Sequence, residues 1–532
     1  MADRDSGQEA LNRARLEQFV GSRLSRRAVL RSTAGGAAAG IGAGSLVPAQ
    51  RAAAAPRLSA VSLAAARLVL QESGDSAAAA VAAANALDPK PAEIFVVWES
   101  ALQAQDPINF SGPRWEELTG IRVTVIERPF TELFSSQVTE HIGATGGHDI
   151  LSLAPAWQAD FVAQNILEPL DPYIDQYMNR ADLDDYHPLF RNFMNFGGQT
   201  YALFDDGDVI VLYYRRDLFE DAANMEAFEA EYGYPLAAPT TWDEYDDIQA
   251  FFTERGNGEF WGGASQRVAG GLHAWFMEEF RNKGGTFFNP ETMDATVNGE
   301  AGLATLTRMV ESNTTMPPGV ETWGFIEVLT AWMSGQLAMI GGTWPPIGRW
   351  SEGTTAEQLA WVPETQVAGN VGYSVMPEGH SAHNGGFMLG VASQSRNKEA
   401  AYLWAQWATS PSISLERVML PYALRDPYRL SHFASEEYRS RWATAGNYLD
   451  TLEAATDGAL LDLVMPGAVD YHNAVDQAVT AAMAGTDPEE ALAGLDTAWN
   501  EITDRLGRDT QREAYAQYVH CKAPIPMKAD RA

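Results

Sequence analysis

A strand–helix–strand pattern near the start of the main body constrains the fold more than any other feature of the chain. Residues 94–98 (IFVVW) form a short apolar run suited to a buried strand, and residues 121–126 (IRVTVI) alternate like a second strand. Between them, residues 115–118 (WEEL) indicate a helix that ends at Gly120. This spacing predicts a βαβ unit, so we expect an α/β fold that contains a parallel sheet.

The length and composition indicate a large, soluble, globular protein. A chain of 532 residues is too long for one ordinary core, which predicts two lobes or domains with extra segments. The net charge of −33 argues against nucleic acid as a partner, because an acidic surface repels phosphate backbones. A single cysteine, Cys521, permits neither an intramolecular disulfide nor a cysteine-based zinc site.

The N-terminal segment has the order of a secretory signal. Arg26 and Arg27 precede a weakly hydrophobic run at residues 34–47, and residues 51–55 (RAAAA) offer small side chains for cleavage. The paired arginines resemble a twin-arginine export signal. The apolar run is shorter than the roughly 20 residues that span a membrane, and no cysteine follows it for a lipid anchor. We therefore expect residues 1–55 to be a signal peptide and the mature protein to be periplasmic or extracytoplasmic, not lipid-anchored.

Three further segments indicate their local structure. Residues 56–92 are rich in alanine and end at a proline-containing stretch, which we interpret as a partly helical extension or linker. Residues 149–153 (DILSL) predict a third strand. Thr241 and Glu244 have the spacing of a capping box, which predicts the start of a helix.

Five motifs follow one another along residues 93–505. They are Gly147-His148-Asp149-Ile150 with Trp157 and residues 167–171 (LEPLD), then residues 212–219 (LYYRRDLF), 239–244 (PTTWDE), 332–344 (WMSGQLAMIGGTW) and 385–401. In content and order they resemble extracellular solute-binding protein family 1, the maltose-binding-protein-like receptors that serve ABC importers of sugars. Each motif is modest alone, and their collinear order carries the resemblance.

The resemblance implies a two-lobed periplasmic-binding-protein fold with a hinge and a ligand cleft between two α/β lobes. Each lobe would take two pieces of chain: residues 93–204 with 388–440 for the first, 208–386 with 445–515 for the second, and a tail at 516–532. Closure of the lobes over a sugar or polyol would be read by the membrane subunits of an ABC permease. We expect a monomer without a cofactor or enzymatic activity.

A sugar presents flat C–H faces and many hydroxyl groups, so its cleft needs aromatic rings together with carboxylates, amides or arginines. The resemblance and the positions of aromatic and charged residues give these ligand-binding candidates: Trp98, Glu99, Trp157, Asp205, Asp206, Trp275, Trp344, Arg425, Tyr471 and His472. Trp344 lies between the Gly341-Gly342 turn and Pro345-Pro346, which favours a loop at the cleft. The alternative for each tryptophan is core packing, and for Arg425 a surface ion pair.

Other functions stay open at this stage. The sequence has no nucleophile elbow, zinc-protease helix or Walker loop, but a carboxylate pair such as Glu99 with Asp206 leaves a glycosidase conceivable. A purely structural, surface-adhesion role is a further alternative, and it predicts no ligand cleft. Another alternative keeps the receptor fold but changes the ligand to a polyamine, a peptide, ferric ion or glycerol phosphate. Residues 205–208 (DDGD) resemble a calcium-binding turn but lack the twelve-residue EF-hand pattern, so we expect no metal.

Overall fold

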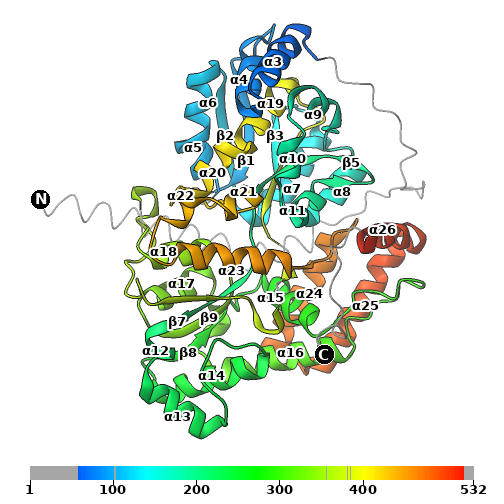
Figure 1. Cartoon of the computed structure of the whole chain (residues 1–532). Coiled ribbons are helices and arrows are strands. Elements are labelled where there is room, and N and C mark those ends of the chain that lie inside the picture. The colour runs from blue at the N-terminus through cyan, green and yellow to red at the C-terminus, as the bar shows by residue number, and fades with distance from the viewer. Residues whose placement is uncertain (1–57, 101–102, 355, 380–381, 384, 521–532) are drawn as a thin grey trace, which may run out of the picture.

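The computed structural model describes residues 58–520, apart from residues 101–102, 355, 380–381 and 384. The expected signal peptide and Cys521 therefore lie outside the described residues. Figure 1 shows two lobes, one above the other, each built around its own β-sheet. Among the described residues, none of the helices combines the length and the apolar composition needed to cross a membrane.

The first lobe contains a five-stranded sheet in the order β2-β1-β3-β12-β6. Its strands are β1 (Glu93–Glu99), β2 (Arg122–Arg128), β3 (Ile150–Leu153), β6 (Ala202–Asp206) and β12 (Phe387–Val391). The predicted βαβ unit is confirmed: β1 and β2 pair in parallel, and α6 (Ser111–Thr119) between them ends at Gly120 with φ 72°. The sheet is mixed rather than parallel, because β12 runs antiparallel to both β3 and β6. This strand enters from the other lobe instead of following a crossover helix.

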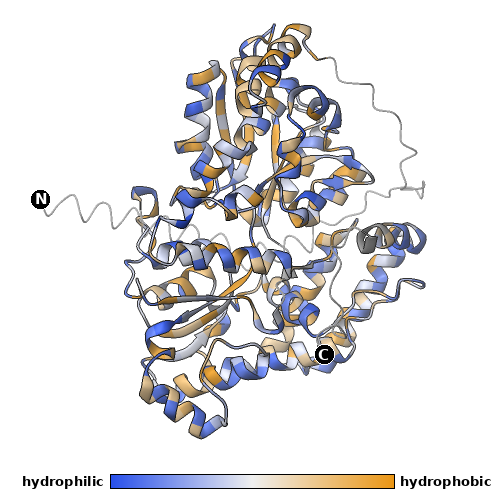
Figure 2. Cartoon of the chain, viewed as in Figure 1, coloured by the Kyte–Doolittle hydropathy of each residue, from blue (hydrophilic) through white to orange (hydrophobic). Residues whose placement is uncertain are grey.

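Helices cover this sheet. They are α5 (Gln105–Asn109), α7 (Phe130–Gly143), α8 (Gln158–Ala163), α9 (Asp171–Tyr177), α10 (Ala181–Asp184), α11 (Pro188–Phe193), α19 (Lys398–Thr409), α20 (Pro411–Met419) and α21 (Leu430–Phe433). Figure 2 shows hydrophobic segments concentrated in the strands and hydrophilic ones along the outer helices, which agrees with the buried strands of each lobe. The apolar strands and the inner helix faces thus form the core.

The alanine-rich extension forms part of the first lobe rather than a free linker. It folds into α3 (Ala60–Glu72) and α4 (Ser76–Asn85), and α4 packs against α19. The Gln406 amide donates to the Ser76 carbonyl at 2.9 Å, and the Ser59 backbone N–H donates to Glu399 at 3.0 Å. Small alanine side chains allow a helix to approach its neighbour closely, so a composition typical of linkers here forms a packed layer.

The second lobe contains a four-stranded sheet in the order β10-β7-β9-β8. Its strands are β7 (Val211–Arg215), β8 (Trp261–Ala264), β9 (Leu337–Thr343) and β10 (Val371–Ser374). The helices of this part of the chain are α12 (Arg216–Phe219), α13 (Ala222–Tyr232), α14 (Trp242–Arg255), α15 (Leu272–Asn282), α16 (Glu300–Glu311), α17 (Phe325–Met333), α18 (Pro346–Ser351), α23 (Ala445–Asp457), α24 (Ala468–Met483), α25 (Pro488–Leu506) and α26 (Arg508–His520). The predicted capping box is confirmed at the start of α14, where the Glu244 N–H donates to Thr241 at 3.2 Å.

Within the residues that the structure describes, the chain passes between the lobes three times. It crosses from β6 to β7, returns from β10 to β12, and crosses again from α22 (Glu436–Arg439) to α23. The lobes also meet away from these crossings, because α24 lies against the short 3-10 turn η1 (Pro155–Trp157). There the backbone N–H of Gly467 donates to the Asp160 carboxylate at 2.8 Å.

Candidate functional site

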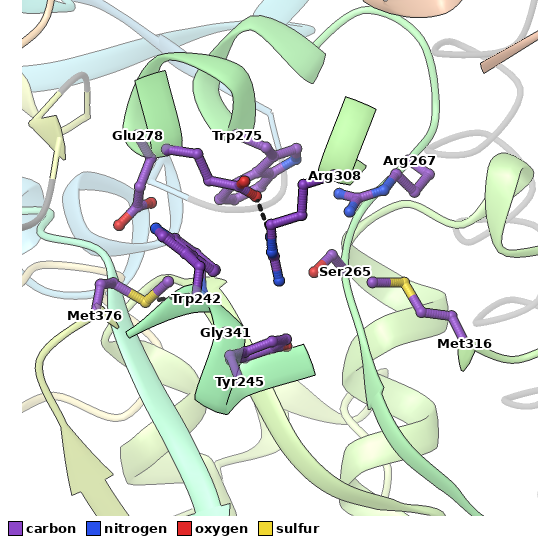
Figure 3. A pocket seen from close by; sticks show the side chains of 12 residues that line it. Trp242, Tyr245, Ser265, Arg267, Trp275, Glu278, Arg308, Met316, Gly341 and Met376 are labelled. Atoms are coloured by element: carbon purple, nitrogen blue, oxygen red, sulfur yellow. Dashed lines mark hydrogen bonds and ion pairs between the residues drawn. The ribbon is translucent and has the colours of Figure 1, made fainter. Parts of the chain in front are cut away.

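A cavity opens in the second lobe between α14, α15, α16 and the end of β9 (Figure 3). Its lining combines aromatic and charged side chains, including Trp242, Tyr245, Trp275, Glu278, Glu279 and Arg308. The free volume of the cavity is about 20 Å³. This volume holds about one water molecule or one small polar group. The cavity alone is thus a subsite for one chemical group rather than the seat of a whole ligand.

Two predicted tryptophans contact each other, and Trp275 lines the cavity, whereas Trp344 lies outside the lining. The rings of Trp275 and Trp344 are 5.2 Å apart at 62°, an edge-to-face arrangement, and Phe325 contacts Trp344 at 5.9 Å. Gly342 makes the approach feasible: its φ is 67°, and a Cβ at this position would lie 3.3 Å from the Trp275 ring. Trp344 is half-buried, so part of its ring stays accessible to a ligand.

The adjacent residues Glu278 and Glu279 of α15 differ in the hydrogen-bond partners of their carboxyl groups. Glu279 pairs with Arg308 at 2.6 Å, and the same guanidinium pairs with Asp246 at 2.6 Å while it stacks over Trp242 at 4.2 Å. Glu278 is 1 % exposed, and neither of its oxygens has a hydrogen-bond partner among the described residues. Burial, assisted by the neighbouring charge of Glu279, raises the pKa of Glu278 well above its ordinary value.

The predicted residues of α24 differ in what they face. His472 stacks on His273 of α15, with ring centres 4.7 Å apart, and its Nε2 lies 3.2 Å from Asp462. Burial, together with the nearby His472, lowers the pKa of His273 to about 3, so this imidazole is neutral at physiological pH. Tyr471 is fully buried, and its hydroxyl lies 2.9 Å from that of Thr503 on α25. His472 thus joins a polar group beside α15, whereas Tyr471 packs in the core.

The first lobe contributes an aromatic cluster. Trp98 at the end of β1 packs edge-on against Phe387 at 5.3 Å, and Phe130 contacts both Phe387 and Trp157. Trp157 belongs to η1, the turn that α24 contacts, so it lies where the two lobes approach each other. Glu99 follows Trp98 and is buried. Whether these residues contact a ligand stays a prediction.

Asp205 and Arg425 form a buried ion pair at 2.8 Å, not the surface pair considered for Arg425. Arg417 contacts the same Asp205 carboxylate and also Asp106. Burial alone would raise the pKa of Asp205, but Arg417 and Arg425 outweigh it and hold the pKa below its ordinary value. Asp205 is therefore a charged centre of a packed network in the first lobe, and it does not line the cavity.

Asp206 lies at the crossing between the lobes. It is buried, and its Oδ1 accepts a hydrogen bond from the Asp426 backbone at 2.9 Å. The carboxylates of Asp206, Asp208 and Asp426 lie within 4.8 Å of one another. Burial raises the pKa of Asp206 well above its ordinary value, with Asp426 adding to the effect. These contacts tie the crossing strand to the first lobe, and a contact of Asp206 with ligand stays a prediction.

Comparison with known proteins decides the family. A sequence model described as bacterial extracellular solute-binding protein matches residues 72–413, which is more than half of the chain. The chain belongs to the bacterial extracellular solute-binding protein family. The resemblance found in the motifs is confirmed, and because this is a family of binding receptors, the glycosidase alternative is set aside.

Curated relatives bear different names. A probable amino-acid ABC transporter periplasmic-binding protein of Sinorhizobium fredii is 27 % identical over 310 residues, which cover 56 % of this chain and 64 % of the relative. The mannitol-binding protein of Pseudomonas aeruginosa is 24 % identical over 281 residues, which cover 52 % of this chain and 59 % of the relative. The chain thus spans less than two thirds of the length of these relatives.

Solved structures share the fold over nearly their whole length. Maltose-bound MalE3 of T. maritima has a TM-score of 0.63 at 22 % identity and covers 77 % of this chain and 99 % of its own. A solute-binding protein of Agrobacterium vitis with bound D-mannitol has a TM-score of 0.63 at 21 % identity, over 78 % of this chain and 99 % of its own. The expected two-lobed α/β fold is confirmed.

The motifs did not point to the polar part of the cavity. Glu278, Glu279 and Arg308 were not among the candidates, and Trp242 fits an ordinary helix start. The available signal was the adjacent pair Glu278-Glu279 inside the aromatic run LHAWFMEEF, because two carboxylates on a buried helix each need a partner.

Proposed function

We propose that the protein captures a neutral polyhydroxy solute, a sugar or polyol, between its lobes and delivers it to the membrane subunits of an ABC permease. The observation that carries the proposal is the Trp275–Trp344 pair beside a cavity with an unpartnered carboxyl group. An aromatic face suits the C–H face of a sugar or polyol, and the carboxyl group suits its hydroxyls. The ligands of the relatives that bind maltose or mannitol have this chemistry.

Closure of the lobes is the natural means of capture for this architecture. Trp157 belongs to η1, which contacts α24, and α24 packs against α15 of the second lobe. A ligand held between these elements would bridge the two lobes and shift the population toward the closed form. A monomer is sufficient for this mechanism.

The export route belongs to the same proposal. Arg26 and Arg27 would direct the folded protein out of the cytoplasm through a twin-arginine route, with cleavage near Ala54 or Ala55 and no lipid attached. Replacement of both arginines by lysine should leave precursor in the cytoplasm. Normal export of that variant would contradict the twin-arginine route.

A thermal-shift panel tests the ligand class. We would add hexitols, pentitols, mono- and disaccharides, amino acids and polyamines to the mature protein, and confirm each hit by calorimetric titration. A ligand at 100 times its Kd adds about 2.7 kcal/mol to the free energy of unfolding, which gives a clear rise in Tm. Stabilisation by sugars or polyols supports the proposal, whereas stabilisation by amino acids or polyamines alone overturns it.

A further inference from the structure

We propose that the cavity beside Trp275 is a subsite for one ligand hydroxyl group and that Glu278 is the residue that binds this group. The inference rests on the proposed sugar or polyol function and adds the part of the ligand that is recognised and the side chain that recognises it.

The geometry places Glu278 next to the aromatic surface. Trp275 and Glu278 are three residues apart on α15, so they share one face of the helix. A Cβ on Gly342 would lie 3.3 Å from the Trp275 ring and 3.9 Å from the Glu278 Oε2. Gly342, the Trp275 ring and the Glu278 carboxyl group therefore lie close together in the lining of the cavity. A ligand that stacks on Trp275 would extend its substituent toward this carboxyl group.

The stability of the folded protein does not explain why a buried glutamate without a hydrogen-bond partner is present at position 278. A buried polar group without a hydrogen bond lowers the stability of the folded protein, and a charged group does so more. Both oxygens of Glu278 lack a partner among the described residues, whereas one oxygen of the neighbouring Glu279 pairs with Arg308. A group retained at such a cost is expected to obtain its hydrogen bonds from something that binds.

The local chemistry selects a neutral hydroxyl group. Burial raises the pKa of Glu278 and so favours its protonated form, which can donate one hydrogen bond and accept another. A hydroxyl group also donates and accepts. Arg267 and Arg308 in the same lining disfavour an ammonium group, while Glu279 disfavours a carboxylate. In Figure 3, Arg267 and Met316 lie on the side of the cavity opposite Glu278 and Met376.

The size of the cavity limits what enters. About 20 Å³ accepts one water or one hydroxyl, so the subsite takes a single substituent such as a terminal alcohol and leaves the carbon chain outside. The remainder of the ligand would then lie along the Trp275–Trp344 pair.

The test compares two variants with two ligands. Glu278→Met removes both hydrogen-bonding atoms at similar volume, and Glu278→Gln keeps a donor and an acceptor. The exposed Glu291→Gln on the loop after α15 is the matched control. Affinities are measured by calorimetric titration for the best-binding hexitol from the panel and for its 1-deoxy and 6-deoxy analogues, each of which lacks one terminal hydroxyl.

We expect Glu278→Met to weaken binding of the hexitol at least tenfold and that of one deoxy analogue less than threefold. Glu278→Gln should stay within a few-fold of the wild type for both ligands. The Tm of ligand-free Glu278→Met should equal or exceed that of the wild type, because a buried unpartnered group has been removed. A residue with a structural role only would lower this Tm and leave the affinity of the folded protein unchanged.

Other outcomes overturn the inference in distinguishable ways. Equal losses of affinity for the hexitol and both deoxy analogues would mean that Glu278 does not recognise a terminal hydroxyl. Tighter binding of the corresponding 1-amino-1-deoxy hexitol than of the hexitol itself would assign the cavity to a cation instead. Polyol binding by the wild type that is insensitive to Glu278 would remove the subsite alone, whereas no sugar or polyol binding by the wild type would remove the proposed function together with it.

Discussion

Two buried carboxyl groups, Asp205 in the first lobe and Glu278 in the second, are held in opposite ways. In the first lobe, Asp205 is enclosed by Arg417 and Arg425, and Arg417 also holds Asp106. In the second lobe, Glu279 is paired with Arg308 while the adjacent Glu278 has no hydrogen-bond partner among the described residues. The side chains of Asp205 and Glu278 are both almost completely buried, so burial alone does not mark a functional residue. The difference lies in whether the hydrogen-bonding capacity of the group is met within the protein.

This difference separates a scaffold from a site. A buried ion-pair network gives a rigid arrangement in which the loss of one member is costly. An unpartnered carboxyl group beside an aromatic pair costs stability and offers binding. Among the candidates from the sequence, Asp205 and Arg425 belong to the buried ion-pair network. Trp275 and Trp344 form the aromatic pair of the candidate site.

The largest expected effect comes from breaking the paired network. Arg417→Ala leaves Asp205 and Asp106 buried without their main cation, so we expect a loss of about 3–5 kcal/mol in the free energy of unfolding. Urea denaturation measures it. Arg114→Ala is the control, because Arg114 forms an exposed pair with Glu416 in the same lobe and should cost about 1 kcal/mol or less. Similar losses for the two variants would show that the buried network contributes no more to stability than an exposed ion pair does.

The second effect concerns the aromatic surface of the second lobe. Trp344→Ala should weaken ligand binding by about 2 kcal/mol or more if the ring is a central anchor. The Tm of the ligand-free protein should change little, because Trp344 is only half-buried. Calorimetric titration beside a melting curve separates the two quantities. Unchanged affinity with a clear loss of Tm would make Trp344 a core residue instead.

The smallest expected effect concerns the Asp160 carboxylate, which has fewer partners than that of Asp205 and more than that of Glu278. Asp160 of α8 accepts one hydrogen bond, from Gly467 at the start of α24, and burial raises its pKa to about 6. A raised pKa means that the folded protein binds the proton more tightly than the unfolded chain does. Its contribution to stability is therefore fully present below about pH 4 and is lost as the pH rises through 6.

Asp160→Asn removes this titration. We expect the stability of the variant relative to the wild type to be greater at pH 7.5 than at pH 4.5, as measured by urea denaturation at both values. The exposed Asp175→Asn in the same lobe serves as the control. A difference between Asp160→Asn and the wild type that does not change with pH would show that the Asp160 carboxylate does not titrate in this range.

The sequence by itself determined the local structure and the family. The βαβ unit, the end of α6 at Gly120 and the capping box of α14 follow from the spacing of residues close together in the chain. Such features depend on backbone geometry and on hydrogen bonds between near neighbours, so a short window of sequence contains their cause. The collinear motifs added the two-lobed fold.

Only the tertiary structure decided which side chains meet. The sequence does not show that Arg417 encloses Asp205, that His273 stacks on His472, or that Glu278 remains without a partner beside Trp275. Nor does composition show that the alanine-rich helices α3 and α4 pack on the first lobe. Each of these outcomes depends on segments that lie far apart in the chain and are brought together by the packing of helices and sheets. Whether a buried carboxylate is paired or open is set by that packing, because its partner comes from another part of the chain.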